Sequence, residues 1–161
     1  MIVDLYPFEA TVASGASEED IIEKIDIGGI SLIRGAAKNF EDVVIIPSQA
    51  DYATLHEILR ERGARTTLEE RRHFARRAFA VSSHYDSAIF RYFDAEERSE
   101  LRLTADEAKP LRYGENPHQK GVFYGDLDRY FEQLHGKELP YNNLQDIEAA
   151  VAPVQDFREQ T

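Results

Sequence analysis

Hydrophobic positions in the first hundred residues fall into two kinds of pattern. The apolar runs at residues 2–6 and 42–47 are short, are rich in β-branched side chains and end next to proline, so they predict two buried strands. Elsewhere apolar residues recur every three or four positions, which is typical of helices with one buried face. Such stretches predict one helix that reaches Ile25, a second that follows a pair of glycines and ends at Lys38, and a third that carries Leu55 and Ile58.

Capping residues mark the ends of these helices. Ser17 and Ser48 precede the first and third helix, and a serine hydroxyl at that position accepts a hydrogen bond from a free backbone amide. Gly63 is placed to end the third helix. Residues 11–20 are polar, and we expect them to form a loop after Pro7.

A long helix is predicted from Leu68 to Phe93. Thr67 and Glu70 have the spacing of a capping box, in which each side chain bonds the backbone of the other. Behind them a stripe at helical spacing indicates core or interface; it comprises Leu68, Ala75, Ala78, Phe79, Ser82, Tyr85, Ile89, Tyr92 and Phe93.

The pattern changes after Glu100, where turn formers replace the helical spacing. We expect strands at residues 101–103 and 122–124, and a short helix from Asp126 to Leu134. Asn142 or Asn143 is suited to cap a final helix, which Pro153 is expected to kink or break. The change indicates a domain boundary between about residue 94 and residue 111.

The predicted strands of the first part are too few for a stable parallel sheet. Three or more strands with a covered face are normally needed. We therefore expect the sheet to be completed by residues outside this chain or by another chain, and the sequence to be a fragment.

Composition narrows the class of protein. The chain has 161 residues, of which 42% are hydrophobic and 30% are charged, and its net charge is −11. An acidic chain is poorly suited to nucleic acid, since that binding depends on Lys and Arg neutralising phosphates. No apolar run approaches the roughly 20 residues that span a bilayer, and no signal peptide is evident. The absence of cysteine excludes disulfides and thiolate metal sites and fits a cytoplasmic protein.

The segment DIGGISLIRGAAKN, from Asp26 to Asn39, is the first candidate for chemistry. Glycines ahead of a helix allow backbone amides to approach a ligand, and phosphate suits a helix N-terminus. The alternative is that Gly28 and Gly29 only permit a tight turn and that Lys38 is an ordinary helix-ending cation. Tyr6 follows a predicted strand, at the end where ligands bind in open α/β sheets, or it is simply a half-buried aromatic residue.

The segment LRYGENPHQKG is the second candidate. It places a guanidinium, a phenol, an amide and an imidazole around Gly114 and Pro117. Arg112 is suited to bidentate contact with phosphate, and Tyr113 to stacking on a heterocycle. The alternative is a solvated polar turn.

Four segments in this order resemble the bifunctional purine biosynthesis family that combines IMP cyclohydrolase with AICAR transformylase: DLYPFEATVAS, DIGGISLIRGAAKN, LRYGENPHQKG and PYNNLQDIEAA. The resemblance extends from about residue 2 to about residue 157. It implies an α/β fold in which the C-terminal half of a methylglyoxal-synthase-like domain joins the first segment of a cytidine-deaminase-like transformylase domain. Residues 1–94 would be a partial IMP cyclohydrolase domain, 95–110 a linker, and 111–161 the incomplete start of the AICAR transformylase domain.

The resemblance also implies the reactions and the residues. The transformylase passes a formyl group from 10-formyltetrahydrofolate to AICAR, and the cyclohydrolase closes formyl-AICAR to IMP with loss of water; neither uses a metal. The implied residues are Lys38, Asp26 and Tyr6 for cyclohydrolase catalysis, Val3, Asp4, Ile27, Gly28 and Gly29 for nucleotide binding, and Arg112 and Tyr113 for AICAR binding. Many relatives have Asn where this chain has Asp4.

The resemblance further implies a homodimeric enzyme acting on purine nucleotides in the cytoplasm. The family's N-terminal phosphate-binding loop and the transformylase segment with the catalytic His are not in this sequence, so we expect little activity from the chain alone. A different hypothesis is a non-catalytic nucleotide-binding or oligomerisation module derived from the same enzyme.

Overall fold

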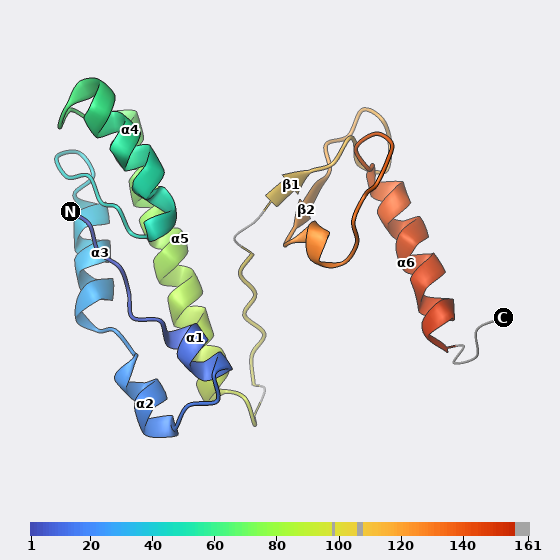
Figure 1. Ribbon diagram of the computed structural model, residues 1–161, viewed down its shortest axis with the longest axis horizontal. Coiled ribbons are helices and arrows are strands. Elements are labelled where there is room, and N and C mark those ends of the chain that lie inside the picture. The colour runs from blue at the N-terminus through green and yellow to red at the C-terminus, as the bar shows by residue number, and fades with distance from the viewer. Residues whose placement is uncertain (98, 106–107, 157–161) are drawn as a thin grey trace. The chain divides into compact units, whose positions relative to one another are not determined.

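A computed structural model describes residues 1–97, 99–105 and 108–156, and over these ranges the chain combines helices with one small sheet (Figure 1). The chain divides into two compact units, Met1–Thr104 and Ala105–Thr161. The mixture of helix and strand agrees with the α/β class expected from the sequence. None of the helices in the described ranges is both long enough and apolar enough to cross a bilayer.

The first unit is mainly helical. Its elements are α1 (Phe8–Ala13), α2 (Glu18–Glu23), α3 (Gly28–Lys38), the 3-10 turn η1 (Gln49–Asp51), α4 (Tyr52–Arg62) and α5 (Leu68–Phe93). The expected helices are confirmed, with small shifts at their ends. The helix at residues 18–25 stops at Glu23, and α3 begins at Gly28 itself rather than after the glycines.

The caps expected from the sequence are present. The hydroxyls of Ser17 and Ser48 accept bonds from the amides of Asp20 and Ala50. Gly63 ends α4 with a φ of 64°, a backbone conformation that glycine adopts without strain. These bonds satisfy amides or allow a chain reversal within a few residues, so the sequence alone is sufficient to predict them.

The capping box of α5 is also present. Thr67 accepts a bond from the Glu70 amide, while the Glu70 carboxylate accepts one from the Thr67 amide. The helix then continues without interruption through residues 82–84 to Phe93.

Helix α1 was not expected, and the prediction of a loop over residues 11–20 was wrong for its first part. Phe8 is buried and meets the rings of Tyr85 and Tyr92 edge-on, with centroid distances of 6.2 and 5.8 Å. A six-residue helix has little stability of its own. Burial of Phe8 against α5 therefore explains why a short helix forms in a polar stretch.

The prediction of two regular strands in the first unit was wrong. Residues 2–6 and 42–47 meet in parallel, but only one bridge forms, between Ile2 and Ile46. The Val3 amide donates to the Ile46 carbonyl at 3.0 Å, and the Ile46 amide donates to the Met1 carbonyl at 2.9 Å. An isolated parallel pair gains too little packing to extend into a sheet, which is the physical reason for the difference.

Alternation along the N-terminal segment nevertheless agrees with a strand that has one covered face. Val3 and Leu5 pack against the core, whereas Asp4 and Tyr6 are exposed. Side chains two residues apart in an extended chain point to the same side. Asp4 and Tyr6 therefore share the solvent-facing side of this segment.

The core of the first unit lies where α3 packs beside α5. A larger cluster is centred on Ile33, Ile45, Ile46, Phe74 and Ala78, and a smaller one on Phe8, Ile21, Tyr85 and Ala88. Helix α5 contributes to both clusters, so one helix supports both ends of α3. Three members of the predicted α5 stripe remain substantially exposed, namely Leu68 at 49%, Phe79 at 43% and Phe93 at 61%.

The second unit holds a two-stranded antiparallel sheet, η2 (Leu127–Arg129) and α6 (Tyr141–Asp156). Strand β1 (Ala108–Pro110) pairs with β2 (Val122–Tyr124), with Lys109 opposite Phe123. The strand expected at residues 122–124 is confirmed. The one expected at residues 101–103 was wrong, because that segment is extended but unpaired, and the guanidinium of Arg102 lies 4.3 Å from the centre of the Phe90 ring.

Two further predictions for the second unit, a helix at residues 126–134 and an asparagine cap for the last helix, were wrong, and of the expected kink or break at Pro153 the break does not occur. The helix expected from Asp126 to Leu134 is only the turn η2, and Asp126 does cap it. Helix α6 begins at Tyr141, so neither Asn142 nor Asn143 is its N-cap, and Pro153 lies within the helix instead of breaking it. A proline late in a helix removes one hydrogen bond but leaves the preceding turns intact, which explains its tolerance here.

Candidate functional site

Asp26 is buried at the N-terminus of α3. Only 9% of its surface is exposed, and its Oδ1 accepts a hydrogen bond from the Gly29 amide at 2.6 Å. A carboxylate at this position satisfies a free amide and interacts favourably with the helix dipole. The sequence thus folds locally so that α3 holds the Asp26 carboxylate in one orientation.

The two glycines of the motif have different physical roles. A Cβ added at Gly29 would lie 2.5 Å from Asp26 Oδ2 and 2.8 Å from both Cγ and Oδ1. Apart from the adjoining residues and the backbone of α3 itself, no atom of the described ranges lies within 4 Å of the same addition at Gly28. Gly29 is therefore required by the carboxylate, whereas Gly28 leaves open space beside it for a ligand to approach.

This arrangement weighs against phosphate at the start of α3. The Gly29 amide is already bonded to a carboxylate, and a second negative group there would be repelled. The structure favours a neutral hydrogen-bonding group, such as a carboxamide, over phosphate beside Asp26.

Tyr6 lies at the same end of α3 as Asp26. The residue exposes 57% of its surface, and the ammonium of Lys24, two residues before Asp26, sits 5.8 Å from the centre of its ring. Its neighbour Leu5 packs against both core clusters, and in the smaller one it joins Ile25 and Ile30, which flank Asp26 in the sequence. The structure therefore brings the exposed phenol of Tyr6 to the region of the Asp26 carboxylate.

The expected nucleotide-binding residues are placed less uniformly. The Asp4 carboxylate accepts a hydrogen bond from the Tyr52 hydroxyl at 2.6 Å, and this bond raises the pKa of Tyr52 above its ordinary value. Val3 points into the core and its amide is used by Ile46, while Ile27 exposes 71% of its surface. Asp4 is thus held by another residue, and Val3 has only its carbonyl available to a ligand.

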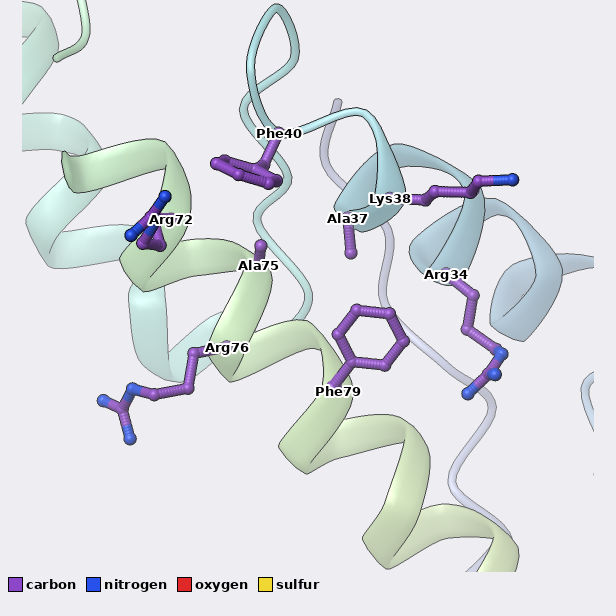
Figure 2. A pocket seen from close by; sticks show the side chains of 9 residues that line it. Arg34, Ala37, Lys38, Phe40, Arg72, Ala75, Arg76 and Phe79 are labelled. Carbon is purple, nitrogen blue, oxygen red and sulfur yellow. The ribbon is translucent and has the colours of Figure 1, made fainter. Parts of the chain in front are cut away.

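Lys38 is the last residue of α3 and is exposed beside a groove between α3 and α5 (Figure 2). Phe40 and Phe79 form aromatic walls, with Ala37 and Ala75 near them, in a volume of about 780 Å³. The cations around this groove are Arg34, Lys38, Arg72 and Arg76, and no acidic residue of the described ranges lines it.

Two of the three arginines that line the groove, Arg34 and Arg72, lie over aromatic rings. The guanidinium of Arg34 lies 5.4 Å from the centre of the Phe79 ring and donates to the Ser82 hydroxyl at 3.0 Å. Arg72 lies 5.4 Å from the centre of the Phe40 ring. In an acidic chain, a local group of cations attracts an anionic ligand in spite of the opposite net charge.

The structure does not bring Asp26 and Lys38 together. Asp26 lies just before the first residue of α3, and Lys38 is its last residue. From Gly28 to Lys38 the helix rises by about 15 Å, at 1.5 Å per residue. A lysine side chain is much shorter than this separation. Within one chain, the two groups therefore contact different parts of any bound molecule.

Arg112 and Tyr113 lie in the second unit, on a loop fixed by its own backbone. The guanidinium of Arg112 lies 5.6 Å from the centre of the Tyr113 ring. The Arg112 amide donates to Leu139, and the Tyr113 carbonyl accepts from the amide of Tyr141, each at 3.1 Å. These bonds tie the loop to the start of α6, with Arg112 exposed and Tyr113 partly buried.

Tyr85 is a site residue that sequence reasoning treated only as part of a core stripe. Its hydroxyl accepts from the Asp26 amide at 2.8 Å and donates to the Lys24 carbonyl at 2.7 Å. Helical spacing indicates that Tyr85 is buried but does not indicate which backbone it bonds. No sequence signal connects two positions that lie 59 residues apart.

The described ranges contain no group of three or more His, Cys, Asp and Glu side chains arranged to hold a metal ion. What they do contain is an oriented carboxylate near an exposed phenol, a cationic groove, and an arginine–tyrosine pair on a separate unit. Features of this kind are typical of proteins that bind polar or anionic small molecules by hydrogen bonds, ring stacking and positive charge.

Comparison with known families makes the assignment specific. The family model described as AICARFT/IMPCHase bienzyme matches residues 36–161, and the chain belongs to this family.

Relatives among characterised proteins agree. The chain is 66% identical to the bifunctional purine biosynthesis protein PurH of Bacteroides thetaiotaomicron over 161 residues, which is all of this chain and 32% of that protein. It is 47% identical to PurH of Rhodospirillum rubrum, over 99% of this chain and 32% of that protein. It is 46% identical to PurH of Chlorobium luteolum, over 98% of this chain and 33% of that protein. The chain spans about a third of the length of these relatives.

Proposed function

We propose that this chain supplies part of both active sites for the last two steps of IMP biosynthesis. These are formyl transfer from 10-formyltetrahydrofolate to AICAR, and cyclisation of formyl-AICAR to IMP with loss of water. The observation that carries the proposal is the buried Asp26 carboxylate, which the Gly29 amide holds in place within the family motif. On this proposal residues 1–94 belong to a methylglyoxal-synthase-like cyclohydrolase domain, 95–110 to a linker, and 111–161 to a cytidine-deaminase-like transformylase domain.

Cyclisation requires a weak nucleophile to attack a formyl group. The carboxamide nitrogen adds to the formyl carbon, and the formyl oxygen then leaves as water after taking up protons. A carboxylate that accepts a hydrogen bond from the carboxamide orients its nitrogen and can remove a proton from it. Asp26 is suited to this role because one of its oxygens is held by Gly29 while the other has no hydrogen bond within the described ranges. Tyr6 is suited to donate a hydrogen bond to the formyl oxygen.

Lys38 is proposed as the second catalytic group, acting on a different part of the nucleotide from Asp26. An ammonium donates a proton or stabilises a developing negative charge. The arginines beside it in the groove add positive potential that attracts an anionic substrate. Its distance from Asp26 along α3 means that it does not share a reacting atom with Asp26 in the same chain.

The second unit is proposed to bind AICAR through Arg112 and Tyr113. Tyr113 is suited to stack on the imidazole ring, and Arg112 to contact an anionic group of the ligand. As the resemblance of the sequence motifs implies, the activity is proposed for a homodimeric, metal-independent enzyme that acts on purine nucleotides in the cytoplasm, with the remaining parts of each site supplied by other segments.

The test uses the full-length bifunctional protein that contains this sequence. Lys38→Ala should lower the cyclohydrolase kcat by about a hundredfold, the scale of general acid–base catalysis, and leave transformylase activity unchanged. Arg112→Ala should lower transformylase activity and leave cyclohydrolase activity unchanged. A higher cyclohydrolase KM with an unchanged kcat would show that Lys38 only binds substrate, since uniform binding does not contribute to kcat. Equal loss of both activities in either variant would argue against the assignment.

An alternative function is a non-catalytic module that associates through α5. The exposed Leu68, Phe79 and Phe93 on that helix favour it, because apolar surface of this kind is often covered by a partner. Sedimentation of the 161-residue chain, with and without IMP, tests this alternative. A monomer that does not bind IMP would exclude it.

A further inference from the structure

The hydroxyl of Tyr85, a residue of α5, bonds the backbone of the turn between α2 and α3. Its side chain extends from α5, only 7% of the residue is exposed, and its ring packs edge-on against Phe8. The hydroxyl accepts from the Asp26 amide at 2.8 Å and donates to the Lys24 carbonyl at 2.7 Å. A single hydroxyl therefore satisfies two backbone groups that belong to no helix.

These two bonds fix the backbone of the turn that carries Asp26. Lys24 is the C-cap of α2, and Asp26 lies just before α3, so the chain changes direction between them. Without the hydroxyl, the Asp26 amide would be buried without a partner, and the turn would move to solvate it. Helix α5 therefore determines, through this hydroxyl, where the Asp26 backbone lies.

Asp26 is consequently held both at its backbone amide and at its side-chain carboxylate. Tyr85 holds the amide, and the Gly29 amide holds the carboxylate at 2.6 Å. With the backbone on one support and the Oδ1 atom on another, the side chain has little freedom to rotate. Catalytic groups need this kind of support, because displacement by about 1 Å is enough to reduce a rate by two orders of magnitude.

Packing alone does not account for the hydroxyl. A phenylalanine at this position would fill the same space beside Phe8 and Ala88 in the smaller core cluster. Burial also raises the pKa of Tyr85 above its ordinary value, so the group remains protonated and able to donate to Lys24 across the physiological range. The hydroxyl has a function beyond that of the ring.

We infer that Tyr85 is a positioning residue for the cyclisation reaction: it places Asp26 through the Asp26 amide without touching the substrate. This inference rests on the proposed role of Asp26.

The experiment compares tyrosines on one helix in the full-length bifunctional protein. Tyr85→Phe removes the hydroxyl and keeps the ring. We expect the cyclohydrolase kcat to fall by about ten- to a hundredfold, with KM changed less than about twofold and transformylase activity unchanged. Tyr92→Phe is the matched control, because Tyr92 also packs edge-on against Phe8 and its hydroxyl has no hydrogen bond within the described ranges. The control should keep full activity.

A double-mutant cycle with Asp26→Asn separates positioning from general loss of structure. If Tyr85 acts through Asp26, the double variant should be no slower than Asp26→Asn alone, because the group that Tyr85 positions is already gone. Losses that multiply would overturn the inference, as would a Tyr85→Phe protein as active as the Tyr92→Phe control.

Failure of the underlying function would look different. A fully active Asp26→Asn protein would remove the proposed role of Asp26, and the inference with it, whatever Tyr85→Phe does. Should Tyr85→Phe lose transformylase activity through misfolding, Gly29→Ala provides the second route, since its Cβ displaces the same carboxylate from the α3 side. The inference then requires the same selective loss of cyclohydrolase kcat, and an unchanged kcat would overturn it.

Discussion

Adding one methyl group at Gly29 should destabilise the protein, although alanine is normally the better helix former. A Cβ at Gly29 would lie 2.5 Å from Asp26 Oδ2, whereas ordinary contacts of a Cβ are 3.4 Å or longer. The Asp26 carboxylate is the group that must move, by about 1 Å, and it then loses the hydrogen bond from the Gly29 amide.

The size of the effect follows from opposing contributions. Losing a hydrogen bond to a charged group costs about 1.5–3 kcal/mol. Replacing glycine by alanine in a helix contributes up to about 1 kcal/mol in the opposite direction. Gly29→Ala should therefore lower the free energy of unfolding by about 1–2 kcal/mol. At Gly28 the new Cβ would meet nothing in the described ranges beyond its adjoining residues and the backbone of α3, so Gly28→Ala should be neutral or raise the free energy of unfolding by up to about 1 kcal/mol.

The assay is urea denaturation followed by circular dichroism, with both variants and the parent protein under the same conditions. The midpoint should fall for Gly29→Ala and should stay the same or rise for Gly28→Ala, while the slope of the transition stays unchanged. The neighbouring glycines make each variant the control for the other. If Gly29→Ala is as stable as Gly28→Ala, the Asp26–Gly29 contact does not constrain this turn, and the reasoning is refuted.

Two further predictions concern charged groups of α5. The hydrogen bonds from Arg62 and from the Thr67 amide lower the pKa of Glu70 from 4.5 to about 2. The Glu70 carboxylate therefore stabilises the fold fully above pH 4.5, and this stabilisation is lost as the pH falls toward 2. Glu70→Gln should thus be less stable than the parent at neutral pH and equal to it near pH 2, whereas Glu69→Gln should show no such convergence; a pH-independent difference would contradict this. Arg77 pairs with the buried Asp51 at 3.2 Å, and the second Asp51 oxygen has no partner within the described ranges, so Arg77→Met should lower the free energy of unfolding by about 2 kcal/mol or more. Arg76→Met is its control, because no ion pair of Arg76 occurs in those ranges, and similar losses from both would argue against the pairing.

Local hydrogen bonding made much of the helical structure predictable. Ser17, Ser48 and the Thr67–Glu70 box each bond within three residues of themselves, so short sequence patterns identify them. The same holds for the link from Asp26 to Gly29, three residues apart. The family motifs then implied the reactions in which we propose that this turn takes part.

Long-range packing decided the rest. Helix α1 exists because Phe8 reaches Tyr85 and Tyr92, and the expected strands reduce to one bridge because only two segments meet there. The strand partner of residues 122–124 is residues 108–110, for which the sequence predicted no strand. None of these outcomes follows from propensity, since each depends on partners distant in the sequence.

The candidate site divides in the same way. By itself, the sequence determined that an acid precedes a glycine pair and that a lysine ends the helix which follows, because caps, helix length and motifs are short-range properties. Only the tertiary structure decided that Tyr85 supports the Asp26 amide, that Tyr52 holds Asp4, and that Lys38 belongs to a cationic groove with residues of α5. The physical reason is that a hydrogen bond or a charge acts over a few ångströms in space, and the fold alone determines which residues come within that distance.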